Sequence, residues 1–205
     1  MAWTPPRTWV NGETIDASIM NTHIRDNLNY LKTQVAAHFI LSGASIIPST
    51  TNGCKPPAKT EFASNGQNMM LTEFGATTKQ YGEWLLPYLP DDYGGGTITA
   101  KFIWTHNLAS FASNTVVWGL QARAYADGDS IDAAWGTAQE VTDAPHSSLL
   151  YTMRVSAATS PITIGNTPAA GKACQFRAYR DGAGASDTYG AVSYLLGVAI
   201  NYTRA

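Results

Sequence analysis

Residues 9–35 read WVNGETIDASIMNTHIRDNLNYLKTQV, and this stretch decides how the rest of the chain is interpreted. Asn11-Gly12 is a typical turn pair. Thr14 or Asp16 is placed to cap a helix, because a side-chain oxygen can accept a hydrogen bond from the free backbone amides of its first turn. Apolar residues then recur at spacings of three and four, as in the contact surface of a coiled coil. This seam consists of Met20, Ile24, Leu28, Leu31 and Val35.

The predicted helix has one apolar face and no helix of similar length to pair with, because the chain after residue 60 has the pattern of β-structure. An isolated amphipathic helix of about 20 residues is only marginally stable in water. The seam must therefore pack on its own β-domain, on a copy of itself, or on a larger assembly. We favour an intermolecular contact and predict that the seam mediates oligomerisation.

Two tryptophans, Trp3 and Trp9, lie in a short polar segment before this helix. Pro5 and Pro6 exclude a regular helix there. Large aromatic side chains gain most from burial, and this segment cannot build a core of its own. Either the tryptophans fold back on the next domain or they insert into a partner. We predict the second, with Trp3 and Trp9 as anchoring residues.

The chain is weakly charged: 14% of its 205 residues are charged, against about a quarter in an average domain, and the net charge is −2. Its Lys and Arg residues are scattered, so we exclude nucleic-acid binding as a main function. No run approaches about 18 consecutive apolar residues, which predicts no membrane span. The first residues lack the apolar core of a signal peptide. We expect a protein made in the cytoplasm that leaves it only within something larger.

From residue 60 onward the hydrophobic period changes to two, which predicts strands separated by Gly- and Asp-rich turns. Nine strands are expected, at residues 60–64, 68–74, 81–86, 97–105, 115–125, 137–142, 149–156, 173–179 and 192–202. The fold class is therefore mainly β: an antiparallel β-sandwich, with a jelly roll as the first choice. The Pro-rich residues 48–59 are typical of a linker. We thus predict an N-terminal anchor segment with an oligomerisation helix (1–47), a linker (48–59) and a β-sandwich head (60–205).

The residues that could carry chemistry are dispersed. No histidine lies at a metal-ligand spacing from another or beside a cysteine, and two cysteines alone cannot complete a zinc site. These residues are His23, His38, His106, His146, Cys54 and Cys174, and two unpaired thiols are favoured over a disulfide. Asp91-Asp92 and Asp127-Gly128-Asp129 fit turns better than a calcium loop. We predict no catalytic site, no metal and no cofactor, and therefore a protein that is not an enzyme.

The sequence WVNGETIDASIMN (9–21), continued by IRDNL (24–28) and Leu31-Lys32, resembles an N-terminal segment of structural proteins of tailed bacteriophages and prophages. These are minor tail, tail-fibre or other virion-associated proteins. GGGTITAKFIW (94–104), VVWGLQARAY (116–125) and LLGVAINY (195–202) are similar to the β-domains attached to that segment. The resemblance covers most of the chain and implies a location in the virion and no enzymatic residues.

The leading hypothesis is a homotrimeric short fibre or receptor-binding-like tail component, anchored in other virion proteins by its N-terminus. Its head would contact a host cell-surface glycan or protein through exposed aromatic loops, for instance residues 88–96 and 126–135. The alternative is a decoration (cement) protein that stabilises a capsid or tail. A cement protein would spread its contacts over the sides of the sandwich, whereas a host-binding protein would concentrate them at the N-terminus. A catalytic tail component would need two carboxylates across one cleft, which the sequence does not place.

Overall fold

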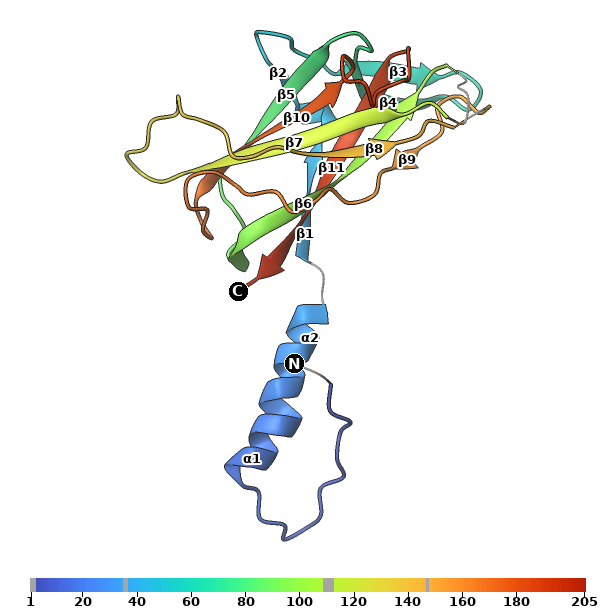
Figure 1. Cartoon of the computed structure of the whole chain (residues 1–205). Coiled ribbons are helices and arrows are strands. Elements are labelled where there is room, and N and C mark those ends of the chain that lie inside the picture. Colours follow the sequence, from blue (N-terminus) through green and yellow to red (C-terminus); the bar gives the residue numbers. More distant parts are fainter. Residues whose placement is uncertain (1–2, 35–36, 109–112, 147) are drawn as a thin grey trace.

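The computed structural model describes residues 3–34, 37–108, 113–146 and 148–205. Figure 1 shows a β-sandwich from which one N-terminal helix projects. The helix runs without interruption through α1 (Ala17–Met20), a π-helical turn η1 (Asn21–Arg25) and α2 (Asp26–Gln34). Asp16 caps its start, because the Asp16 carboxylate accepts a hydrogen bond of 2.9 Å from the amide of Ile19.

The described strands form two antiparallel sheets. The first contains, in spatial order, β3 (Ala58–Phe62), β4 (Gln67–Phe74), β11 (Ser193–Arg204), β6 (Tyr93–His106) and β9 (Arg154–Val155), with β1 (Ala37–Ser42) also paired to β11. The second contains β2 (Ile47–Pro48), β5 (Lys79–Leu86), β10 (Ala173–Asp181), β7 (Val116–Tyr125) and β8 (Gln139–Asp143). A short 3-10 helix, η2 (Gly43–Ser45), connects β1 to β2.

Eight of these strands, β4 to β11, make a jelly roll. They divide into two sheets with the orders β4-β11-β6-β9 and β5-β10-β7-β8. This is the arrangement of two interlocked Greek keys, in which the chain crosses repeatedly between the sheets. The predicted fold class, an N-terminal helix followed by an antiparallel β-sandwich, is confirmed. Each of the nine predicted strands overlaps an observed one, from β3 to β11.

The predicted domain boundary needs correction, because the β-sandwich begins at Ala37 and not at residue 60. β4 pairs with β11 only at Ser193–Leu195, which leaves the rest of that edge of β11 unpaired. β1 fills it, in register from Ala37 opposite Tyr202 to Ser42 opposite Gly197. The predicted linker (48–59) lies inside the sandwich as well: Gly53 bridges to Tyr81 and Cys54 is buried. Pairing satisfies backbone groups that would otherwise lose water without compensation.

Aromatic side chains fill the space between the sheets. Trp118 of β7 lies at the centre, with the ring of Phe74 edge-on at 5.2 Å and that of Phe102 stacked at 5.7 Å. Trp118, Leu120, Ala122 and Ala124 alternate along β7 and are fully buried, as the period of two predicts. Cys54 and Cys174 are free, buried thiols, and burial raises the pKa of each to about 12.

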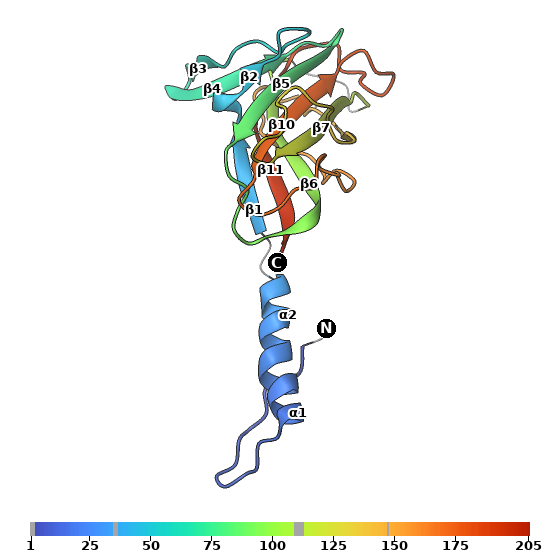
Figure 2. The same ribbon diagram turned by 90° about the vertical axis from the view of Figure 1, so that its left-hand side faces the viewer.

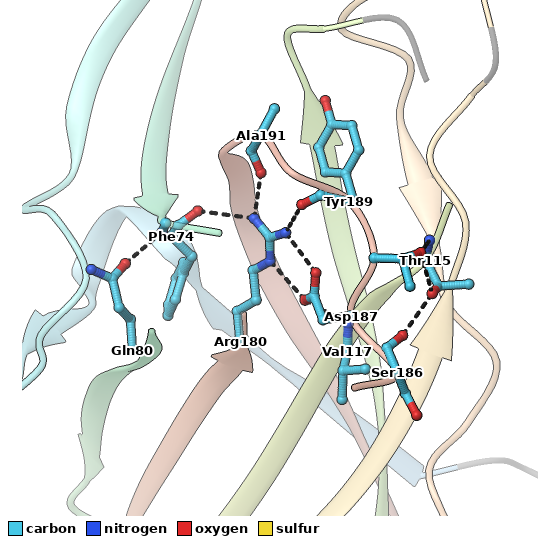
Figure 3. A network of polar contacts seen from close by, with 11 residues as sticks. Phe74, Gln80, Thr115, Val117, Arg180, Ser186, Asp187, Tyr189 and Ala191 are labelled. Carbon is cyan, nitrogen blue, oxygen red and sulfur yellow. Dashed lines mark hydrogen bonds and ion pairs between the residues drawn. The ribbon is translucent and has the colours of Figure 1, made fainter. Parts of the chain in front are cut away.

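A buried ion pair closes one end of this core (Figure 3). The Arg180 guanidinium donates two hydrogen bonds to Asp187, of 2.9 and 2.8 Å, and neither side chain is exposed. Its remaining N–H groups reach the carbonyl oxygens of Phe74, Tyr189 and Ala191. Asp187 also accepts from the amide of Val117. Arg180 thus joins β4, β7, β10 and the segment before β11, with all five of its donors used.

We expect the Asp187→Asn variant to lose about 3–5 kcal/mol of unfolding free energy, because the buried guanidinium keeps its charge without a counter-ion. Urea unfolding followed by circular dichroism measures the change. Lys55→Ala is the matched control, because the Lys55 side chain in the Lys55–Glu73 pair is 69% exposed and the loss of such a solvated pair costs less than about 1 kcal/mol. Similar losses in the two variants would contradict the role given to Arg180.

His106, at the end of β6, is a second buried polar residue. Its Nε2 accepts a 2.9 Å hydrogen bond from the amide of His146, so the proton lies on Nδ1, which donates to the carbonyl of Leu108 at 3.0 Å. Burial lowers the pKa of His106 below its usual 6.5, and the positive charge of Arg154 acts in the same direction. The folded protein therefore holds a neutral His106.

Because His106 is neutral in the folded protein, we expect the free energy of unfolding to depend on pH. The unfolded chain takes up a proton at His106 near pH 6.5 and the folded chain does not, so the unfolding free energy falls as the pH drops below about 6.5. We expect His106→Gln to remove this component between about pH 7.5 and 5.5 in urea titrations. His38→Gln, on an exposed position of β1, is the control. An unchanged slope in the His106 variant would show that the effect arises elsewhere.

Candidate assembly and binding surfaces

The first candidate surface is the N-terminal segment, in which an arm (residues 3–13) runs back along the helix (Figures 1 and 2). Asn27 holds the arm. Its Oδ1 accepts from the amide of Thr4 at 2.9 Å, and its Nδ2 donates to the carbonyl of Thr4 at 2.8 Å. This pair satisfies both backbone groups of Thr4 and explains why Asn27, in the middle of a helix, is buried.

The two predicted anchoring residues lie on this arm, and each is about 40% exposed. The ring of Trp3 contacts that of Tyr30 on α2, with 5.9 Å between centroids. Arg7 lies 5.0 Å from the centre of the Trp9 ring and forms an ion pair with Glu13. Trp3 and Trp9 are therefore positioned by the arm and the helix, and a large part of each remains accessible.

The seam is the second feature of this segment. Met20, Ile24, Leu28 and Leu31 are each between 39% and 61% exposed, and Val35 lies outside the described residues. The arm lies on the side of the helix that carries Asn27 and Tyr30, next to the seam, and leaves about two-fifths or more of each of these four side chains exposed. Exposed apolar side chains at regular helical spacing are costly in water and favour contact with another helix. Their role in oligomerisation stays a prediction.

We expect Asn27→Ala to release the arm, because the backbone of Thr4 loses both hydrogen bonds. Trypsin should then cleave after Arg7 several-fold faster than in the wild type, as measured by mass spectrometry of timed digests. Asn29→Ala, at an exposed position of the same helix, should leave the rate unchanged. Equal rates in the two variants would contradict the role of Asn27.

We expect Leu28→Glu to disrupt self-association, because a carboxylate in an apolar contact must be dehydrated without a partner. Sedimentation velocity at one protein concentration compares this variant with the wild type and with Asn29→Glu, which adds the same charge on the side of the helix away from the seam. Retention of the wild-type mass by Leu28→Glu, or loss of mass by both variants, would contradict the seam as the contact.

A third candidate surface is a hollow of about 340 Å³ on the outer face of the second sheet. Strand alternation directs Leu85 of β5, Gln175 of β10 and Tyr125 of β7 outward, and the loop after β7 supplies the rim. The hollow is lined by Leu85, Tyr125, Ala126, Asp129, Ile131, Ala173 and Gln175. One of the two loops expected to contact a host, residues 126–135, thus contributes to it directly.

The rim of this hollow is held by hydrogen bonds. Asp129 Oδ2 accepts from the amide of Ala126 at 2.7 Å and from Asn166 Nδ2 at 2.6 Å. These bonds, the backbone amide foremost, lower the pKa of Asp129 below its usual value. The Tyr125 hydroxyl donates to Gln175 Oε1 at 2.9 Å, and Gln175 Nε2 donates to Glu83 at 2.7 Å. The polar groups of the hollow are therefore fixed in place.

Beside the hollow, Arg177 lies between two aromatic rings, 4.8 Å from the centre of Tyr81 and 4.5 Å from that of Trp135. Gln121 orients the guanidinium by accepting hydrogen bonds from Arg177 when its amide is placed with the oxygen toward it. Sequence reasoning missed this stack. The alternation along residues 175–180 does place Gln175 and Arg177 on one face, but their partners come from β5, β7 and the following loop.

The other loop expected to contact a host, residues 88–96, is only partly exposed. Tyr88 is accessible, whereas Leu89 and Tyr93 are buried and Gly94–Gly96 belong to β6. The Tyr93 hydroxyl donates to the carbonyl of Gly96 at 2.7 Å. Burial raises the pKa of Tyr93 to about 12. Tyr93 therefore acts in the core rather than in a contact surface.

A second hollow, of about 310 Å³, lies on the first sheet at the end away from the helix, where β6 finishes and β11 starts. Its walls are mainly apolar, and Met69, Leu150, Tyr151 and Met153 are all well exposed. The ring of Tyr151 meets that of Phe62 edge-on at 5.0 Å. This concentration of exposed apolar side chains is typical of a surface that contacts another protein.

The part of the chain that the structure describes contains no group of three or more His, Cys, Asp or Glu residues able to hold a metal ion. His106 and His146 lie together in the hydrogen-bonded pair described above, whereas His23 lies in the N-terminal helix and His38 in β1. Asp92 accepts from Tyr202 at 2.6 Å and pairs with Arg204. Among the described helices, none is long and apolar enough to span a membrane.

No protein-family model and no curated protein matches the chain. Solved structures of similar fold include CBM35 from Cellvibrio japonicus Abf62, at 10% identity over 80% of this chain and 92% of that chain, with a TM-score of 0.44. A family 11 carbohydrate-binding module from Clostridium thermocellum matches at 10% identity over 82% and 89%, with a TM-score of 0.37. The K1 cleaved adhesin domain of Lys-gingipain from Porphyromonas gingivalis W83 matches at 18% identity over 82% and 99%, with a TM-score of 0.39. The likeness is one of general fold.

Proposed function

We propose that this chain is a non-enzymatic structural protein of a tailed-bacteriophage virion, a homotrimeric short fibre or receptor-binding-like component anchored by its N-terminus. The exposed seam on a helix that projects from a complete β-sandwich is the observation that carries the proposal. The sandwich has its own core, so the helix is not needed to cover it. A projecting apolar helix is explained by copies that associate side by side.

The arm supports the same function. Asn27 fixes it along the flank of the helix beside the seam, and the described seam side chains keep 39–61% of their surface exposed, so self-association and anchoring use neighbouring surfaces of one helix. Trp3 and Trp9 remain accessible for other virion proteins. The head, attached at the opposite end of the helix, is then displayed outward toward a host cell-surface glycan or protein.

A decoration or cement protein is the second candidate, and the apolar hollow around Met69, Leu150 and Tyr151 favours it. A protein that clamps capsid or tail subunits needs apolar contacts on the sides of its sandwich, far from the N-terminus. The two functions share the virion location and differ in which surface is covered on the particle.

Incorporation into particles tests the proposal. Phage particles are purified from the phage or prophage that carries the gene, with either the full chain or a chain lacking residues 1–36, and are probed with antibodies to the head. We expect the full chain to co-sediment with particles and its head to be accessible, and the truncated chain to be absent. Absence of the full chain from particles would overturn the virion function. A head that is masked on intact particles would favour the cement function.

A further inference from the structure

We propose that the hollow between β5, β7, β10 and the 126–135 loop is a binding site for a neutral saccharide. This inference rests on the proposed host-contacting function, because it names the ligand class of the displayed head. A volume of about 340 Å³ falls in the range of small-molecule sites. The hollow also has the two properties that a sugar ring requires, an apolar surface and fixed polar groups beside it.

The apolar surface is formed by Leu85, Ile131 and the ring of Tyr125. Leu85 and Ile131 are 62% and 81% exposed, so neither side chain is explained by packing in the core. The Arg123 guanidinium lies 5.5 Å from the centre of the Tyr125 ring. A pyranose has C–H groups on its faces, which match surfaces of this kind.

The polar groups are held in place before any ligand arrives. Gln175 is fixed by Tyr125 and Glu83, and Asp129 is fixed by Ala126 and Asn166. Both hydrogen bonds of Asp129 engage Oδ2, so within the described residues Oδ1 can accept from a sugar hydroxyl. Arg123, which carries the positive charge near Tyr125, donates to the carbonyl of Ala134 and does not itself line the hollow.

The charges of the site select a neutral sugar. The Asp129 carboxylate, kept ionised by its hydrogen bonds, lies in the wall, and Glu83 contacts Gln175 behind it. The cations that also act on Asp129, Arg123 and Lys172, lie outside the lining of the hollow. An acidic group of a ligand cannot donate a hydrogen bond to Asp129, the one charged residue among the described residues that line the hollow, and is repelled by it. A neutral hexose or N-acetylhexosamine instead supplies hydroxyl donors to Asp129 and Gln175.

A printed array of neutral and acidic saccharides, probed with the full-length chain, tests the inference. The best-bound saccharide is then titrated calorimetrically against the wild type and three variants. We expect Leu85→Ser and Gln175→Ala to weaken binding at least about tenfold, because one removes apolar contact and the other a fixed polar group. Ile47→Ser is the matched control: Ile47 lies on the same sheet, is 63% exposed and does not line the hollow.

Three results would overturn the inference: no saccharide bound on the array, a preference for acidic saccharides, or equal affinity of all variants. Host attachment that depends on a cell-surface protein and not on a glycan would also overturn it. The test is separable from that of the virion function. If the chain binds a saccharide but is absent from particles, the binding site stands and the virion function is overturned. If the chain is incorporated into particles but binds no saccharide, the virion function stands and the binding site is overturned.

Discussion

The pairing of β1 with β11 connects the two halves of the molecule. β11 is the strand at the centre of the first sheet, with β6 along one edge and only three residues of β4 on the other. β1 completes that edge over six residues and directly follows the helical segment in the chain. The helix therefore reaches the sandwich at a strand that is itself part of the sheet, rather than through a long linker.

This connection gives the protein two ends with different chemistry. The N-terminal segment presents apolar side chains, the seam on one side of the helix and the two tryptophans on the arm. The outer face of the second sheet presents charged, amide and aromatic groups that are largely paired with one another, such as Arg177 between Tyr81 and Trp135. Apolar surface suits permanent assembly, and an ordered polar surface beside an apolar hollow suits reversible binding.

Most of the fold could be predicted from the sequence, because hydrophobic alternation is a local signal. Trp118, Leu120 and Ala122 share a face by their spacing alone, and this face is the one that the core buries. β1 and β2 could not be predicted, because residues 36–47 are apolar without alternation and prolines follow. The strand identity of β1 depends on the free edge of β11, near the other end of the chain. The helix, its cap at Asp16 and the turn at Asn11-Gly12 have local signals, and the structure contains them.

The candidate sites were less predictable for the same reason. The exposure of the seam could be expected, because the chain after residue 60 has the hydrophobic period of β-strands and so predicts no second helix to cover it. The position of the arm could not be predicted. A buried Asn27 that binds the backbone of Thr4 looks, in the sequence, like any other asparagine in a helix. The saccharide hollow combines side chains of three strands with the loop after β7, so the topology had to be known first.

The central claim is that the projecting helix assembles the chain. Its most direct test is the molar mass in solution, by light scattering after size-exclusion chromatography, of the full-length protein and of residues 37–205, the complete sandwich, with circular dichroism to verify that the sandwich is folded. The account predicts a full-length mass of three times the chain mass of 22.0 kDa and a monomeric sandwich. A full-length protein of 22.0 kDa, or the same oligomer for both, would contradict it.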